Sequence, residues 1–225
     1  MKIPKPYFIR YSITDLSEGT ALNRPNMIEL RRKIDILIID DEDLLVEERL
    51  SASGFHITHK TDIDSVRDVE SYSIILCDIR GVGTRFDSPK EGAFLIREIK
   101  NLYPNKQLVA YTGSKFDPSY NEYLKCADAI VDKGISLDDW VSLLDDQIKK
   151  AINPQFQWQR LRQYLLDANV ATIDVAKIED RYVQAIQKKD FSNLTSLANT
   201  SNDAAKTAIS DFISSVCVKL ILGGL

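Results

Sequence analysis

Cysteine and histidine are scarce in this chain of 225 residues, which has three cysteines and two histidines. The cysteines, Cys77, Cys126 and Cys217, are odd in number and lack the spacing of a metal site, so we expect buried free thiols in a reducing cytoplasm. The C-terminal third contains no histidine, so we find no Ser-His-Asp or Cys-His catalytic set. We assign His56 and His59 a structural or surface role, because no further metal ligands lie near them in the sequence.

Long apolar runs and a dominant charge are also absent. No N-terminal segment has the character of a signal peptide, and the longest apolar stretch, residues 212–222, is shorter than the ~20 residues that span a bilayer. The 29 basic and 33 acidic residues give a net charge of −4, which argues against wholesale binding of nucleic acid. We therefore expect a cytoplasmic protein without a membrane partner. With 44% hydrophobic residues, the chain can bury a real core.

Four short apolar runs each lead into a polar residue, a pattern that indicates buried parallel strands. The runs cover residues 34–39, 73–77, 108–111 and 129–132. The polar side chains at their ends are, in chain order, Asp40 with Asp41, Asp78, Thr112 and Lys133. Because sites in open α/β sheets form at the carboxyl ends of the strands, we expect these side chains to converge on one pocket.

Helical patterns alternate with the strand patterns. Residues 44–52 predict a short helix, 55–59 a short strand and 63–71 another brief helix. Ser88 to Glu91 predicts a capping box that opens a further helix. Five strands alternating with five helices predict an α/β fold with a doubly wound five-stranded parallel sheet over residues 34–152.

Two regions flank this α/β domain. Residues 1–33 form an N-terminal arm, in which alternating apolar residues at positions 7 to 13 predict a strand with one buried face. Strand signals vanish beyond Asn153 and Pro154, so residues 153–225 are predicted to form an all-α C-terminal domain. Its apolar stripe from Ile209 to Leu220 is expected either to pack within the chain or to form a homodimer interface.

The expected convergence of carboxylates favours a metal site. Three carboxylates in one cleft repel each other, which raises their pKa values unless a cation lies among them. A hard divalent ion with oxygen ligands and retained waters meets this need, and Mg²⁺ fits that description. Lys133 and Thr112 would then contact the oxygens of an anion, a set that suits a phosphoryl group carried on Asp78.

These motifs, taken together, resemble the receiver domain of two-component response regulators. The resemblance rests on residues 38–42, 76–78, 110–113 and 131–133, with residues 91–100 similar to the third helix of that family. It covers about residues 34–150. The chain departs from the family pattern where Gly134 replaces a proline, where Ile130 replaces an aromatic residue, and where the loop 79–87 is longer and lacks a proline.

The resemblance implies a role for each matching residue. Asp78 would be the phosphoacceptor, Thr112 the switch hydroxyl and Lys133 the lysine that contacts the phosphoryl group. Mg²⁺ would be held by oxygen atoms of Asp40, Asp41, Asp78 and the backbone carbonyl of Arg80. The phosphoryl group would come from a histidine kinase or phosphotransfer protein of a phosphorelay. The chain would be no enzyme beyond self-phosphotransfer and autodephosphorylation.

The helical C-terminal domain leaves the output open. Its eight basic and seven acidic residues form no dense cationic track, so we expect a downstream protein partner rather than DNA. One alternative is a degenerate, non-phosphorylated receiver that acts as an adaptor. Another is a transcription regulator with an atypical helical DNA-binding domain.

Overall fold

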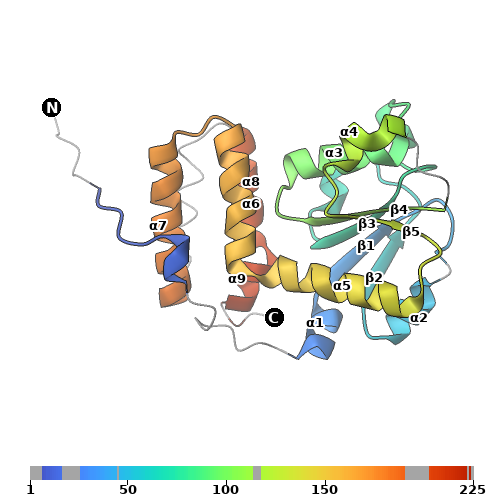
Figure 1. Cartoon of the computed structure of the whole chain (residues 1–225), viewed down its shortest axis with the longest axis horizontal. Helices are drawn as coiled ribbons and strands as arrows, with labels where there is room; N and C mark the ends of the chain where they lie inside the picture. Colours follow the sequence, from blue (N-terminus) through green and yellow to red (C-terminus); the bar gives the residue numbers. More distant parts are fainter. Residues whose placement is uncertain are drawn as a thin grey trace.

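The computed structural model describes residues 7–16, 26–44, 46–113, 118–190, 203–221 and 223. An α/β domain and a bundle of helices lie side by side in Figure 1. The long helix α5 (Leu137–Ile152) runs along the α/β domain toward the bundle, and α6 (Pro154–Asp167) begins directly after Asn153. None of the helices in the described ranges has the length and apolar character needed to cross a membrane.

The α/β domain is built on a five-stranded sheet in which all neighbouring strands are parallel. The strands are β1 (Asp35–Ile39), β2 (His56–Lys60), β3 (Ile74–Asp78), β4 (Gln107–Thr112) and β5 (Ala129–Asp132). Their spatial order, β2-β1-β3-β4-β5, is a doubly wound order with its switch point between β1 and β3. The predicted fold class is therefore confirmed, and the crevice beyond the ends of β1 and β3 is the expected place for a site.

Helices cover both faces of the sheet, because successive strand residues point to opposite sides. One face is covered by α1 (Met27–Lys33), α2 (Glu47–Ala52) and α5, and the other by α3 (Glu91–Leu102) and α4 (Asn121–Leu124). Ile36 and Ile38 of β1 belong to the first core, and Leu37 and Ile39 to the second. Every residue of β3 is buried, which explains its uninterrupted apolar run.

Two local predictions in this domain are wrong. The helix predicted for residues 63–71 is a single 3₁₀ turn, η2 (Val66–Val69), because Asp68 accepts hydrogen bonds from the backbone of Asp64 and Ser65 and tightens the segment. The capping box predicted at Ser88 does not form either. Glu91 has a left-handed backbone with φ of 47°, and its carboxylate turns instead toward the loop that follows Asp78.

The C-terminal bundle consists of α6, α7 (Thr172–Lys188), α8 (Asp203–Ser214) and α9 (Val216–Ile221). Three aromatic rings hold it together: the Trp158 ring stacks on Tyr182 at 5.5 Å, and Phe212 meets Tyr182 edge-on at 5.0 Å. Ile209 and Phe212 of the predicted stripe are buried in this core. Of the two alternatives for the stripe, the structure thus shows packing within the chain.

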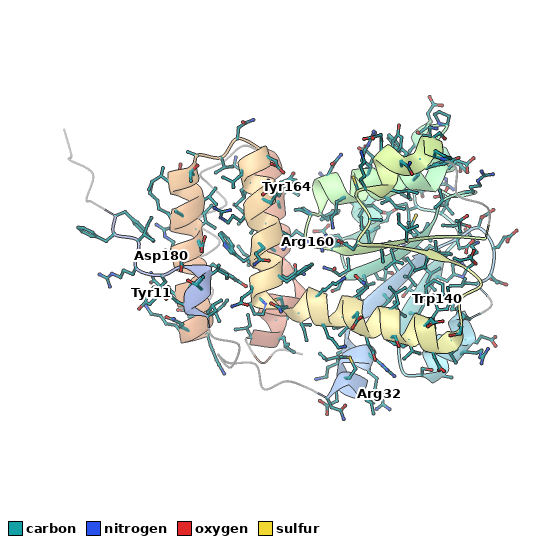
Figure 2. All side chains as sticks on the ribbon, in the orientation of Figure 1. Tyr11, Arg32, Trp140, Arg160, Tyr164 and Asp180 are labelled. Atoms are coloured by element: carbon teal, nitrogen blue, oxygen red, sulfur yellow. The ribbon has the colours of Figure 1, made fainter. Side chains whose placement is uncertain are left out.

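The N-terminal segment is not a strand, contrary to the prediction. Residues 7–16 end in a 3₁₀ turn, η1 (Ile13–Asp15), and lie along α7. The backbone N–H groups of Arg10 and Tyr11 each donate to Asp180 of α7 at 2.8 Å, so they are satisfied by a carboxylate rather than by a neighbouring strand. Figure 2 shows Tyr11 and Asp180 side by side. Leu16 completes the contact by entering the core of the bundle.

A polar seam joins the bundle to the α/β domain. Arg160 of α6 pairs with Asp128, just before β5, at 2.9 Å, and Tyr164 donates to the Asn101 carbonyl at the end of α3 (Figure 2). Asn105, just before β4, donates to Gln157 of α6 at 2.9 Å. The seam therefore contacts the amino-terminal ends of β4 and β5, opposite the edge at which the strand-end acids lie.

Candidate functional site

The polar residues at the strand ends come from four neighbouring strands. Asp40 follows β1, Asp78 is the last residue of β3, Thr112 is the last residue of β4, and Lys133 follows β5. Because these strands are parallel and adjacent, their ends meet at one edge of the sheet. Thr112 accepts a backbone hydrogen bond from Lys133 N at 3.0 Å, which extends the pairing of β4 and β5 up to the site.

Three carboxylates lie together at this edge. Asp40, Asp41 and Asp78 each place an oxygen within 4.8 Å of the others. Asp40 is fully buried and Asp78 nearly so, with 6% of its surface exposed, whereas Asp41 is exposed. Burial raises the pKa of Asp78, and the charge of Asp40 adds to this effect. The cluster thus has two deep oxygen donors and one that faces solvent.

Lys133 bridges the two buried carboxylates. Its Nζ lies 2.5 Å from Asp78 Oδ2 and 3.0 Å from Asp40 Oδ2. Burial lowers the pKa of Lys133, but its hydrogen bonds to Asp78 and Asp40 outweigh burial and hold the pKa above its usual value. The lysine is therefore charged, and it opposes the rise in the pKa of Asp78.

Tyr111, a residue that sequence reasoning missed, fixes Asp40 in place. Its hydroxyl donates to Asp40 Oδ2 at 2.9 Å, and its ring meets Trp140 of α5 edge-on at 5.9 Å. Burial and the charge of Asp40 raise the pKa of Tyr111, so the hydroxyl stays a proton donor. The available signal was a tyrosine within a strand predicted to be buried, because a buried phenol needs a hydrogen-bond partner.

His59 supports the same aspartate from the backbone side. Its Nε2 donates to the carbonyl oxygen of Asp40 at 2.8 Å, while its Nδ1 lies 3.0 Å from Glu47 of α2. His56 instead pairs with Asp35 at the other end of β2, where both side chains are largely exposed. His59 therefore supports the acidic site structurally, and His56 lies at the surface.

Beyond β3 the loop that follows Asp78 and the first turn of α3 pack closely against the acidic cluster. A Cβ atom on Gly92, in the first turn of α3, would lie 1.9 Å from the carbonyl oxygen of Asp78. A Cβ atom on Gly81 would lie 2.3 Å from Asp41 Oδ1, so the Asp41 carboxylate rests directly on the loop. Arg80 N donates to Asp78 Oδ1 at 3.3 Å. Position 92 has no room for a Cβ atom because the obstacle is backbone, and the φ of 77° favours glycine at position 81.

Ile130, which stands where receivers have an aromatic residue, lies on β5 with 45% of its surface exposed. The structure brings Asp40, Asp41, Asp78 and Lys133 together, and Thr112 ends the strand between Asp78 and Lys133. The electrostatics of the site suit a divalent cation: the donors are all carboxylate oxygens, burial raises the pKa of Asp78, and Lys133 is outnumbered by three acids.

Comparison with known proteins bears on the fold. No family model matches this chain, and no curated protein matches its sequence. The solved receiver domain of NtrX from Brucella abortus is 23% identical, with a TM-score of 0.43, over 51% of this chain and 98% of that one. A CheY-like receiver domain protein from Methanospirillum hungatei JF-1 is 19% identical, with a TM-score of 0.43, over 52% of this chain and 94% of that one.

The strand order and the parallel register define the fold. A parallel sheet in the order 2-1-3-4-5, with helices on both faces, is the arrangement of CheY. Residues of the α/β domain therefore have the receiver-like fold, and an all-α bundle follows it in the chain.

Proposed function

We propose that this chain is a response-regulator-type signalling protein with Asp78 as its phosphoacceptor. The observation that carries the proposal is the position of Lys133 Nζ, within hydrogen-bond distance of both Asp78 and Asp40. A lysine in this place can pair with an oxygen of a phosphoryl group attached to Asp78. Phosphoryl transfer needs mainly positioning and charge stabilisation, and this site offers both.

Mg²⁺ is the cofactor that the donor set favours. Asp40, Asp41 and Asp78 would hold it together with the backbone carbonyl of Arg80, and the exposed side of Asp41 leaves room for retained waters. When bound, Mg²⁺ supplies charge stabilisation to the phosphoryl oxygens. Tyr111 and His59 keep Asp40 oriented for that role.

The transfer itself is a single displacement at phosphorus. A carboxylate oxygen of Asp78 forms a bond to phosphorus as the bond from phosphorus to a histidine nitrogen of the donor protein breaks, and that nitrogen keeps the electron pair. Lys133 pairs with one phosphoryl oxygen and the Thr112 hydroxyl donates to another. The donor is a histidine kinase or phosphotransfer protein, and the chain itself catalyses no more than this transfer and the later loss of the phosphoryl group.

The helical bundle is the proposed output. Arg160, Asn105 and Lys106 hold it against the amino-terminal end of β4, whose carboxyl-terminal end carries Thr112. The site and the seam therefore lie at opposite ends of the same strand, so a change in packing at the site has only the length of β4 to cross before it reaches the bundle. A protein partner suits the bundle better than DNA does, because Arg160 is buried in the seam and other basic side chains pair within the bundle.

The test is uptake of beryllofluoride and of a small phosphodonor with Mg²⁺ present, read by intact mass and amide hydrogen exchange. Asp78→Ala removes the acceptor. Asp43→Ala is the matched control, because Asp43 is an exposed acid in the same loop as Asp41 and lies outside the cluster. We expect wild type and Asp43→Ala to gain the phosphoryl mass, with slower exchange near Thr112 and Lys133, and Asp78→Ala to gain nothing.

A folded wild-type protein that takes up neither ligand would refute the phosphoacceptor proposal and leave the adaptor alternative. Exchange changes that reach α6 and α8 would support the bundle as output. DNA binding with a steep salt dependence would instead favour the transcription regulator.

A further inference from the structure

The peptide group between Arg80 and Gly81 is held in place by a hydrogen bond from its N–H group. Gly81 N donates to Glu91 Oε2 at 2.9 Å. In a planar trans peptide the N–H and the C=O point in opposite directions. A carboxylate that fixes the Gly81 N–H therefore also fixes the direction of the Arg80 carbonyl oxygen, which belongs to the same peptide.

The acidic cluster lies against this same peptide. The Asp41 carboxylate packs on Gly81 so closely that a Cβ atom there would lie 2.3 Å from Asp41 Oδ1. Arg80 N donates to Asp78 Oδ1 at 3.3 Å, so the residue that carries the carbonyl also contacts the second acid. The peptide is thus held between Asp41, Asp78 and Glu91.

Glu91 adopts an unfavourable backbone to make this contact. Its φ of 47° lies in the left-handed region that residues with a Cβ atom avoid. Such strain persists where the surrounding structure determines it, and it is often found at functional sites. The rest of the loop is held separately: Asp62 accepts hydrogen bonds from Gly83 N at 2.7 Å and Thr84 N at 3.2 Å. Glu91 is therefore not needed merely to anchor the loop.

We propose that Glu91 is a positioning residue that aims the Arg80 carbonyl at the cation held by Asp40, Asp41 and Asp78. This inference rests on the proposed function, because it assumes that Mg²⁺ binds there. The hydrogen bond to Gly81 N–H also polarises the peptide and makes its carbonyl a better ligand. Glu91 itself touches neither the cation nor the phosphoryl group.

The experiment is a calorimetric titration of the full chain with MgCl₂, without phosphodonor. Glu91→Gly removes the carboxylate and relieves the left-handed backbone, so it should fold. Glu91→Asn, which also tolerates this backbone, is a second truncation. Glu91→Gln keeps an oxygen that can accept from Gly81 N. The matched control is Asp87→Gly, since Asp87 is an exposed acid of the same loop with φ of 48°.

We expect Glu91→Gly and Glu91→Asn to weaken Mg²⁺ binding by about 10-fold, the lower range for a residue that orients a metal ligand. Glu91→Gln and Asp87→Gly should stay close to wild type. Equal Mg²⁺ affinity in wild type and both truncations would overturn the role of Glu91 and leave the proposed function standing. A folded wild type that binds no Mg²⁺ would instead overturn the metal site, and this inference with it.

Discussion

Asp180 of α7 holds the N-terminal segment, residues 7–16, against the bundle. Its carboxylate accepts four hydrogen bonds: from Tyr7 Oη at 2.6 Å, Arg10 N and Tyr11 N at 2.8 Å each, and Gln184 Nε2 at 2.9 Å. Each bond to a charged group contributes about 1.5–3 kcal/mol. Asp180→Ala removes all four, and we expect residues 7–16 to leave α7.

The loss of stability is smaller than the sum of these four hydrogen bonds, because the backbone groups of the released segment form hydrogen bonds with water. What remains lost is the docking free energy, to which Leu16 contributes by its burial to 4% exposure, with Tyr11 and Ile13 partly buried beside it. Burial of a leucine contributes about 1.5–3 kcal/mol, so we expect Asp180→Ala to cost about 2–3 kcal/mol. For a chain of this size that lowers the melting temperature by about 4–12 °C.

Thermal unfolding and amide exchange at Arg10 and Tyr11 check this prediction. Asp174→Ala is the matched control, because Asp174 lies on the same helix and only pairs with Lys177 at i,i+3. It should change stability by no more than about 0.5 kcal/mol. Unchanged exchange at Arg10 and Tyr11 in Asp180→Ala, or a melting temperature equal to that of the control, would refute the reasoning.

The same contact gives a pH dependence. Burial raises the pKa of Asp180, but its hydrogen bonds from Tyr7, Arg10 and Tyr11 outweigh burial and hold the pKa below its usual value. A depressed pKa means that the carboxylate contributes its full stability above the unfolded value of about 3.9 and loses it as the pH falls through the folded value. Protection of Arg10 and Tyr11 should therefore persist at neutral pH and disappear only below about pH 4.

Three further outcomes follow from the site and the seam. Gly92→Ala should lower the urea midpoint by the equivalent of about 3 kcal/mol or more because its Cβ has no room, whereas Gly113→Ala, with an ordinary contact at 3.7 Å, should be nearly neutral. Mg²⁺ at 100 times its dissociation constant should stabilise wild type by about 2.7 kcal/mol in thermal unfolding, and Asp41→Ala should lose this gain. Arg160→Met should lower the free energy of unfolding in urea by about 1–3 kcal/mol, because the partly buried Asp128 loses one of its two cationic partners. An unchanged free energy of unfolding would show that the pair between Arg160 and Asp128 contributes nothing.

Part of this structure follows from local patterns. Strands β1 and β3 are buried on both faces, so they appear in the sequence as unbroken apolar runs that end in an acid. Parallel strands end at one edge, and that geometry alone brings Asp40, Asp78 and Lys133 to one place. The roles of these residues in phosphorylation stay predictions.

Other features depend on contacts between distant segments, and local patterns misrepresent them. Alternation at residues 7–13 suggests a strand, but the segment lies on a helix because Asp180, far away in the chain, satisfies its N–H groups. Ser88 and Glu91 have the spacing of a capping box, yet Glu91 reaches Gly81 across the loop. In both cases the local sequence is compatible with either conformation, and one carboxylate that contacts a distant segment selects the conformation that forms.

Hydrophobic periodicity and parallel pairing specify the α/β architecture, the helical C-terminal bundle and the set of polar strand ends, so these features can be predicted from the amino-acid sequence. Three features are visible only in the folded chain: Lys133 bridges Asp40 and Asp78, Tyr111 and His59 orient Asp40, and the bundle docks opposite the site. The physical reason is that these arrangements depend on which polar groups come into contact once the hydrophobic cores are packed. The spacing of residues along the chain does not specify those contacts.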